Sequence, residues 1–328
     1  MRRKVTIVLP AYNEEASFEL LKERMGRVLA ENPDYDWEFL MVNDGSTDNT
    51  LQQMMRLHRE DAGHWNYVDL SRNFGKEAAM LAGFDYARGD ALIVMDIDMQ
   101  HPVEVIPEML RWWEEGYDDV YAQRRSSRES WFKRRSSRWY YRLLQRSTRV
   151  PIQQNTGDFR LLDRSCIDAL RRLRETERNT KGLYSWIGFR KKGVYYEQLE
   201  RQTGRSKWSV MQLIDLAING LTSYTVAPLR MATILGVSVS LIAFLYLIYI
   251  IIKTVLYGDP VAGYPTLMVT ILFMGGVQLL SLGIIGEYLG KVFMESKGRP
   301  VYLVESYNGV KDGDKENGVK DGDKGMVR

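Results

Sequence analysis

Two long runs without a charged residue stand in the last third of this 328-residue sequence. They cover 231–252 and 260–286, and each exceeds the ~20 residues that an α-helix needs to cross a bilayer. Basic residues flank the outer ends of the pair, whereas the connecting segment offers only Lys253, a bias that places the outer ends in the cytoplasm. We therefore expect a hairpin of two transmembrane helices, at about 231–253 and 263–286, with both chain termini cytoplasmic. Two buried helices of a soluble core are the alternative interpretation.

The segments on either side of the two runs are polar. The single cysteine, Cys166, excludes an internal disulfide and a cysteine-rich metal site, which fits a domain in the reducing cytoplasm. The first residues are basic, but the apolar stretch after them is too short for a signal peptide, so we expect no cleaved leader. Near the other end, 308–315 recurs as 317–324, a polar repeat that predicts a disordered tail.

The region before the uncharged runs alternates strand-like and helix-like stretches. The expected elements are strands at 5–9, 38–42, 67–70, 91–95 and 119–122, and helices near 18–30, 48–58, 75–87 and 103–115. Such alternation is typical of an α/β domain with a parallel sheet that binds a nucleotide. The sequence lacks the glycine-rich turn of dinucleotide-binding domains after its first strand, and it lacks the phosphate loop that ends in Gly-Lys-Ser/Thr.

The strand expected at 91–95 ends in two carboxylates, Asp96 and Asp98, separated by one residue. Binding sites in α/β sheets lie at the carboxyl ends of strands, and two adjacent buried carboxylates are unfavourable without a cation. Oxygen ligands suit Mg2+ or Mn2+, which also bridge phosphates, so a nucleoside diphosphate is the expected partner. A solvated turn is the alternative interpretation of these two residues.

Four strand-end segments carry a resemblance to a known family. They are 9–15 (Leu-Pro-Ala-Tyr-Asn-Glu-Glu), 42–48 (Val-Asn-Asp-Gly-Ser-Thr-Asp), 71–77 (Ser-Arg-Asn-Phe-Gly-Lys-Glu) and 95–102 (Met-Asp-Ile-Asp-Met-Gln-His-Pro). Together they resemble the inverting family 2 glycosyltransferases of GT-A fold. More closely, the chain is similar to the polyprenyl-phosphate glycosyltransferases, which include dolichyl-phosphate mannose synthase and the bactoprenol glucosyltransferases. The resemblance covers 5–299 and implies a Rossmann-like, mixed but mostly parallel sheet.

The resemblance also implies roles for individual residues. Asp96, Asp98 and Asp158 are expected to be catalytic, with Asp98, Gln100 and Asp96 at the metal. The residues expected to bind substrate are Pro10, Tyr12, Glu14, Asp44, Asn73, Lys76, Arg124, Arg160, Arg201 and Lys207.

Several of the substrate-binding assignments concern the nucleotide and the phosphates. The resemblance implies that Asp44 hydrogen-bonds the base, although Asn43 stands where the family more often has aspartate. Arg201 and Lys207, in an Arg-x-x-Gly-x-Ser-Lys loop, would bind phosphate oxygens, and Arg124 matches another phosphate-binding position. A diphosphate leaving group and a phosphate acceptor bring several negative charges together, which is the chemistry that such cations serve.

Other assignments have open alternatives. Asn73 and Lys76 either touch the substrate or simply begin a helix. Arg160 either borders the acceptor or forms an internal ion pair. Asp158 is expected to position the acceptor or to serve as an optional base.

The segment 124–149 is rich in arginine and aromatic residues and holds a single acid, Glu129. Nucleic-acid binding is one interpretation, but a helix on an anionic membrane suits the composition better, because arginine favours anionic head groups and aromatic side chains favour the interface. We therefore expect anionic lipids, and no nucleic acid, as partners of this segment. A second amphipathic helix is expected within 209–230.

These expectations divide the chain into four parts. A glycosyltransferase domain is expected at 1–208, a juxtamembrane helix at 209–230, two transmembrane helices within 231–290, and a cytoplasmic C-terminal segment at 291–328.

The expected reaction is inverting, metal-dependent transfer of a hexose from a nucleotide sugar to polyprenyl (undecaprenyl) phosphate at the cytoplasmic face of a bacterial membrane. The resemblance favours UDP-glucose over GDP-mannose or a UDP-aminoarabinose type of donor, and it suggests a homotetramer. A lipid phosphate has its second pKa near ~6, so it is largely ionised at neutral pH and needs little help from a base.

Three other function classes remain as alternatives. A processive polysaccharide synthase should carry Gln-x-x-Arg-Trp, but Arg135 stands where glutamine is required. A nucleotidyltransferase would not explain the loop at Arg201. A non-enzymatic membrane scaffold would bind no nucleoside diphosphate.

Overall fold

The computed structural model of the protein describes residues 2–124, 156–176, 178–196 and 263–311, together with scattered positions between 229 and 256. The chain divides into two compact units. The first, here called the sheet unit, comprises 1–138, 150–206 and 300–328, and the second, the helical unit, comprises 139–149 and 207–299. The last part of the chain therefore returns to the sheet unit after the helical unit.

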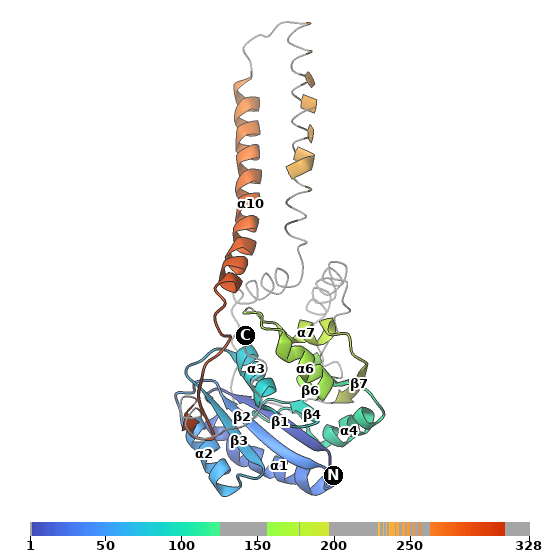
Figure 1. Ribbon diagram of the computed structural model, residues 1–328. Helices are drawn as coiled ribbons and strands as arrows, with labels where there is room; N and C mark the ends of the chain where they lie inside the picture. Colours follow the sequence, from blue (N-terminus) through green and yellow to red (C-terminus); the bar gives the residue numbers. More distant parts are fainter. Residues whose placement is uncertain are drawn as a thin grey trace. The chain divides into compact units, whose positions relative to one another are not determined.

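The sheet unit is built on a sheet that has nine strands in the described ranges (Figure 1). In chain order they are β1 (Lys4–Ala11), β2 (Asp36–Asn43), β3 (Trp65–Leu70), β4 (Ala91–Val94), β5 (Asp119–Arg124), β6 (Thr156–Asp163), β7 (Lys191–Tyr196), β8 (Val304–Tyr307) and β9 (Val310–Lys311). Their order across the sheet is β7-β5-β6-β4-β1-β2-β3-β8-β9. The central strands β4, β1, β2 and β3 are parallel, while β6 and β8 run antiparallel to their neighbours β4 and β3.

Helices cover both faces of this sheet. They are α1 (Phe18–Glu31), α2 (Thr50–Glu60), α3 (Lys76–Tyr86), α4 (Ile106–Glu114), α6 (Arg164–Arg172) and α7 (Thr180–Trp186), with short 3-10 turns η1 (Glu15–Ser17) and η2 (Val103–Val105). Buried side chains of α1, α2 and α4 pack on one face, and those of α3, α6 and α7 pack on the other. Because both faces are covered, the central strands are apolar at nearly every position.

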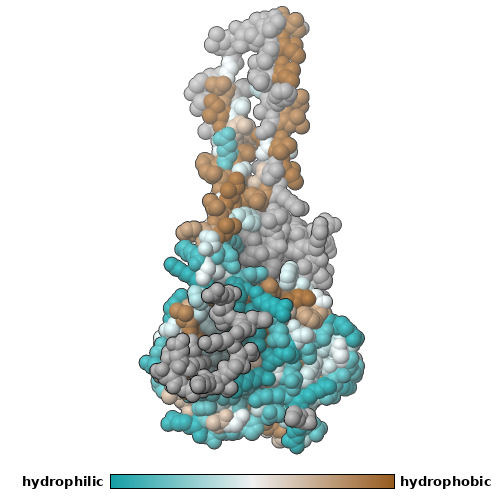
Figure 2. All heavy atoms as spheres, in the orientation of Figure 1, coloured by the Kyte–Doolittle hydropathy of each residue, from teal (hydrophilic) through white to brown (hydrophobic). Residues whose placement is uncertain are grey.

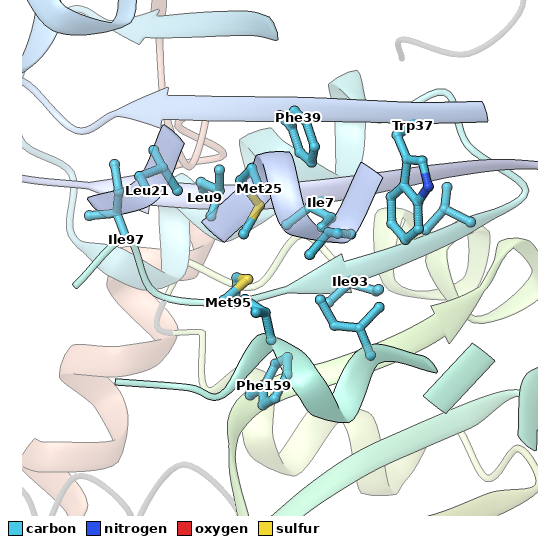
Figure 3. Packing of buried hydrophobic residues seen from close by; sticks show 14 of the residues in the cluster. Ile7, Leu9, Leu21, Met25, Trp37, Phe39, Ile93, Met95, Ile97 and Phe159 are labelled. Atoms are coloured by element: carbon cyan, nitrogen blue, oxygen red, sulfur yellow. The ribbon is translucent and has the colours of Figure 1, made fainter. Parts of the chain in front are cut away.

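The contact between α1 and the sheet shows how the first face is filled. Figure 3 shows Ile7 and Leu9 of β1 beside Leu21 and Met25 of α1. All four side chains are fully buried. Leu21 and Met25 are four positions apart and therefore lie on the same side of the helix. Burying each side chain of this size stabilises the fold by about 1.5–3 kcal/mol, so this layer fixes β1 beneath the loops that follow it.

The predicted α/β fold with a mixed, mostly parallel sheet is confirmed. Each of the five expected strands and four expected helices is present close to its predicted bounds. The sequence patterns do not predict β6, β7, β8 or β9. The last two belong to the sheet unit, although the domain boundary expected at 208 leaves them out.

The helical unit contains α10, which runs from Tyr264 to Ser296. Within it, Phe273–Ser296 is long and apolar enough to cross a membrane, and it is the one helix of this kind in the described part of the chain. Figure 2 shows hydrophobic residues along it, and Leu279 is 72% exposed. Exposed apolar side chains along a whole helix suit a surrounding of lipid and mark a site of membrane association.

The predicted two-helix hairpin is not confirmed by these residues. Of the first expected span, 231–253, only scattered positions are described, and they are helical. The second span, expected at 263–286, corresponds to the first part of α10, and the helix continues past the first charged residue, Glu287. The segment 125–149 lies outside the described residues, and so does nearly all of 209–230.

Candidate active site

A cavity of about 330 Å³ lies at the edge of the sheet where β1, β2 and β4 end. The ends of these strands, the loop after β3 and the first turn of α3 form its walls. The lining residues are Pro10, Ala11, Tyr12, Glu14, Asp44, Asn73, Gly75, Lys76, Ala79, Asp96, Ile97 and Asp98. Four carboxylates and one lysine are among them, so the cavity is acidic with a cation at its wall. The structure thus brings eight of the predicted site residues together.

The pairing of the strands explains why separate motifs meet here. β1 pairs in parallel with β2, Ala11 opposite Asn43, and also with β4, so the residues after all three strands leave the sheet at one edge. β6 is antiparallel, and its Arg160 pairs with Val94 of β4. Asp158, near the start of β6, therefore reaches the same edge as the acids that follow β4.

Hydrogen bonds connect the loop after β1 to the loop after β2. Asn13 has a left-handed backbone (φ 56°), which few residues other than glycine adopt. Its Oδ1 accepts from the N–H of Thr47 at 2.8 Å, and its own N–H donates to Oγ of Ser46 at 3.1 Å. The N–H of Glu14 donates to Oγ1 of Thr50 at 2.8 Å. These polar side chains therefore shape the cavity without lining it.

Asp44 anchors the loop that follows β3. Its Oδ1 accepts from the N–H of Phe74 at 2.7 Å, and its Oδ2 accepts from the N–H of Gly75 at 3.0 Å. Burial raises the pKa of Asp44, and these two donors act against that rise. The loops are in close contact, because a Cβ on Gly45 would lie 2.3 Å from the backbone carbon of Arg72. A hydrogen bond from Asp44 to a base would have to use the remaining lone pairs of the carboxylate.

The contacts of Asn43 explain why asparagine stands where the family more often has aspartate. Its Nδ2 donates to Oδ1 of Asp69 at 2.8 Å, and its Oδ1 accepts from the N–H of Ser46 at 3.2 Å. Burial raises the pKa of Asp69, so this carboxylate depends on its donor. An aspartate at position 43 would place two carboxylates against each other, whereas asparagine supplies the donor that Asp69 needs.

Lys76 joins two carboxylates across the wall of the cavity. Its Nζ lies 2.6 Å from Oδ1 of Asp96 and 2.8 Å from Oδ2 of Asp158. Burial lowers the pKa of Lys76, but the charges of Asp96 and Asp158 outweigh burial and raise it above its ordinary value. The side chain is still 43% exposed. Lys76 is therefore a charged group that a ligand in the cavity can reach.

Asp158 is nearly buried, with 9% of its side chain exposed. Burial raises its pKa, but Lys76 and Lys181 together bring it below the ordinary value, so the carboxylate is ionised at neutral pH. Its Oδ1 has no hydrogen-bond partner among the described residues. Lys181 belongs to no sequence motif. It is near Asp158 because α7 is held against α3, where the N–H of Thr180 donates to Oε2 of Glu77 at 2.9 Å.

Asp98 lines the cavity, and Gln100 is its hydrogen-bond partner. Gln100 donates to Asp98 through its backbone N–H at 3.2 Å and through its Nε2 at 2.6 Å. Burial raises the pKa of Glu14, and the charges of Asp98 and Asp96 raise it further. Within the described ranges, no three or more His, Cys, Asp or Glu side chains gather as metal ligands. Two carboxylates and an amide nevertheless fit Mg2+ or Mn2+, because phosphate oxygens and water commonly complete such sites.

Arg160 lies in an internal ion pair. Its Nη1 is 3.2 Å from Oδ1 and 3.0 Å from Oδ2 of Asp119, and its guanidinium lies 3.7 Å above the ring of Tyr184. Arg160 is 1% exposed and does not line the cavity. The structure therefore supports the ion-pair alternative, and the predicted substrate contact of Arg160 is corrected.

Of the three other predicted cations, the structure describes only Arg124. Arg124 ends β5 and is exposed, outside the lining. Arg201 and Lys207 lie outside the described residues, so their phosphate contacts stay predictions.

Comparison with known sequences decides the family. Residues 6–171 match the family described as glycosyl transferase family 2. A glycosyltransferase of Synechocystis sp., described as uncharacterized, is 44% identical over 95% of this chain and 98% of its own length. This chain is a family 2 glycosyltransferase. A non-enzymatic scaffold is therefore excluded.

The later part of the glycosyltransferase has a match of its own. Residues 227–292 match the family described as the GtrB C-terminal hairpin. The bactoprenol glucosyl transferase of Shigella phage SfX is 40% identical to this chain, over 92% of this chain and 99% of its own length. Among solved structures, the mannosyltransferase PcManGT of Pyrobaculum calidifontis, in complex with GDP-Man and Mn2+, is 13% identical with a TM-score of 0.46 and covers 88% of each chain.

Proposed function

We propose that the enzyme transfers a hexose from a nucleotide sugar to polyprenyl phosphate, with UDP-glucose and undecaprenyl phosphate as the favoured substrates. One observation carries the proposal: strand-end acids and Lys76 converge on a single cavity in a chain that is 40% identical to a bactoprenol glucosyl transferase. The cavity volume of about 330 Å³ falls at the lower end of the usual range for small-molecule sites.

The nucleoside end of the donor fits the part of the cavity between Tyr12 and Asp44. Tyr12 is 47% exposed, so its ring offers a face on which a base can stack. Asp44 lines the cavity and has lone pairs left for a base N–H. This arrangement supports recognition of the nucleoside at the ends of β1 and β2.

A divalent cation would be held by Asp98, with Asp96 and Gln100 beside it. The excess of carboxylates over cations in the cavity supports this assignment, because the diphosphate of the donor adds further negative charge. When bound, Mg2+ or Mn2+ would supply positive charge to the departing diphosphate.

The proposed reaction forms one bond and breaks one. An oxygen of the lipid phosphate bonds to the anomeric carbon, and the bond from that carbon to the nucleoside diphosphate breaks. Attack opposite the leaving group inverts the configuration. The attacking phosphate has its second pKa near ~6 and is already largely ionised, so no residue has to remove a proton. The electron pair leaves with the diphosphate, and Lys76 offsets the negative charge that develops there.

Asp158 positions Lys76 in this proposal and does not act as a base. The charges of Lys76 and Lys181 keep the pKa of Asp158 below its ordinary value, which makes it a weak proton acceptor at neutral pH. Asp96 and Asp158 hold the ammonium group from two sides, at 2.6 and 2.8 Å. Both contacts therefore fix the direction in which Lys76 presents its charge.

The sheet supports an even number of membrane crossings. β3 precedes the uncharged runs and β8 follows them, yet the two strands are paired, so both lie on the same side of any membrane. If α10 crosses once, another segment between β7 and α10 must cross back. The uncharged run 231–252 is long enough. The basic flanks support a cytoplasmic location of the sheet, the side on which nucleotide sugars are found.

A donor panel tests the proposed function. Purified full-length enzyme is mixed with undecaprenyl phosphate, Mn2+ and one radiolabelled donor at a time: UDP-glucose, UDP-galactose or GDP-mannose. We expect label from UDP-glucose in the lipid fraction, and its loss when a chelator is added or when Asp98 is replaced by alanine. Label from another donor alone would correct the sugar. Label in a polymer, or in no lipid with any donor, would contradict the proposal.

A further inference from the structure

The chain that follows α10 pairs with the strand next to the cavity. Val304 of β8 is opposite Leu70, the last residue of β3. One step further, the N–H of Ser71 donates to the carbonyl oxygen of Leu303 at 3.0 Å. The pairing therefore extends past the end of β3 into the loop that follows it.

This loop, 71–75, is the one that forms a wall of the cavity. Asn73 and Gly75 line the cavity directly. The N–H groups of Phe74 and Gly75 donate to Asp44, as described above. The loop is therefore held at one end by the backbone before β8 and at the other by Asp44.

Side chains strengthen the contact with the segment before β8. Tyr302 and Val304 are partly buried and pack against the same apolar cluster as Phe74. The hydroxyl group of Tyr302 also donates to Oδ2 of Asp85 in α3. Leu303, between them, points away and is 54% exposed. This alternation is that of a strand with one face packed on the domain.

We propose that the side chains of Tyr302 and Val304, together with the backbone carbonyl group of Leu303, are a positioning element of the donor site, which sets loop 71–75 in the conformation that binds the nucleotide. A loop that is already ordered loses less conformational entropy when its ligand binds, so support for the loop increases the affinity. This inference rests on the proposed donor site.

Two variants of the full-length enzyme at neighbouring positions distinguish loss of support for loop 71–75 from the effect of a new charge on the surface. Val304→Asp places a charge on the packed face, and Leu303→Asp places the same charge on the exposed face while its carbonyl group remains. Two quantities are measured: the affinity for UDP with Mn2+ by calorimetry, and the hydrogen exchange of the amides in loop 71–75. We expect Val304→Asp to weaken the binding of UDP at least about tenfold. Hydrogen exchange of the loop amides should become faster, while the amides of β1 stay protected. Leu303→Asp should match the wild type in both.

The inference fails if Val304→Asp speeds exchange in the loop but binds UDP like the wild type, or if neither quantity changes. If Val304→Asp exposes the whole sheet to exchange, the variant has lost its fold and Tyr302→Phe becomes the test. This variant removes only the hydrogen bond from the Tyr302 hydroxyl group to Asp85. Its expected effect is a loss of about threefold in UDP affinity, and wild-type affinity would overturn the inference. Failure of the wild type to bind UDP would instead contradict the donor site, while the exchange data would still report on loop support.

Discussion

Two ion-paired groups that involve β6 differ in burial and in what they do. Arg160 and Asp119 are 1% and 0% exposed, whereas Lys76 and Asp96 are 43% and 32% exposed. A fully buried pair cannot reach a ligand, but removal of one partner leaves an unpaired buried charge. A partly exposed lysine between two acids can exchange a carboxylate for a phosphate. Two positions of one strand, Asp158 and Arg160, thus serve the cavity and the scaffold respectively.

Arg160→Ala should have the largest effect, and that effect should be on stability. Asp119 would remain buried without its main partner, at a cost of about 3 kcal/mol, the lower end of the usual range. The lower end applies because Lys191 stays 3.7 Å from Asp119. Thermal unfolding of the purified protein measures the change. Replacing both partners with apolar residues, Arg160→Met with Asp119→Leu, should restore most of the loss. If Arg160→Ala were as stable as the wild type, the pair of Arg160 and Asp119 would have no structural role of its own.

Lys76→Met should show the opposite pattern, with a large loss of turnover and a small change in stability. We expect kcat to fall by about 10²–10³, the usual effect of removing one group that stabilises charge in the transition state. Lys22→Met is the matched control, because Lys22 forms an ion pair with Glu60 on the surface. Initial rates of transfer measure both variants. Full turnover by Lys76→Met would place the group that stabilises the diphosphate elsewhere.

Asn43→Asp should destabilise the loops by about 1–2 kcal/mol at neutral pH. The new carboxylate would face Asp69, whose pKa burial already raises. A raised folded-state pKa gives stability that is present below the unfolded pKa and lost as the pH rises. The deficit of the variant should therefore shrink as the pH is lowered. Unfolding midpoints across a pH series test this, and a deficit that does not depend on pH would show that charge is not its cause.

Asp158→Asn should give the smallest effect, visible mainly through pH. The pKa of Asp158 is lowered in the folded state, so its contribution is present above the unfolded value of 3.8 and is lost as the pH falls through the lower folded value. Wild type and variant should differ in unfolding midpoint at neutral pH and converge only below 3.8. Convergence near neutral pH would mean that the carboxyl group has a raised pKa, and Asp158 would then be a candidate base.

The sequence predicts the cavity well because strand ends leave a local pattern. Asp96 directly follows an apolar run, Asp44 follows another after Asn43, and parallel strands bring such ends to one edge. The partners of these residues are not predictable in the same way. The two backbone donors to Asp44 come from a loop about thirty positions further on, at Phe74 and Gly75. Lys76 reads as the start of a helix, and only the fold shows that Asp158 lies within its reach.

Contacts across the largest sequence separations leave no local signal at all. β8 pairs with β3 although the uncharged runs lie between them, and the side chain of Asn308 accepts from the N–H of Tyr67 across 241 positions. The polar residues around Asn308 predict a disordered tail when they are considered alone. For Arg160, the sequence offers two alternatives, and only burial beside Asp119 decides between them.

A crystal or cryo-EM structure of the enzyme with UDP and Mn2+ tests the proposed donor site most directly. We expect the diphosphate in the cavity between Asp44 and Asp98, with Nζ of Lys76 at hydrogen-bond distance from a phosphate oxygen and with Arg160 still paired to Asp119. A nucleotide bound outside this cavity, or a Lys76 that contacts only Asp96 and Asp158 while UDP is bound, would contradict it.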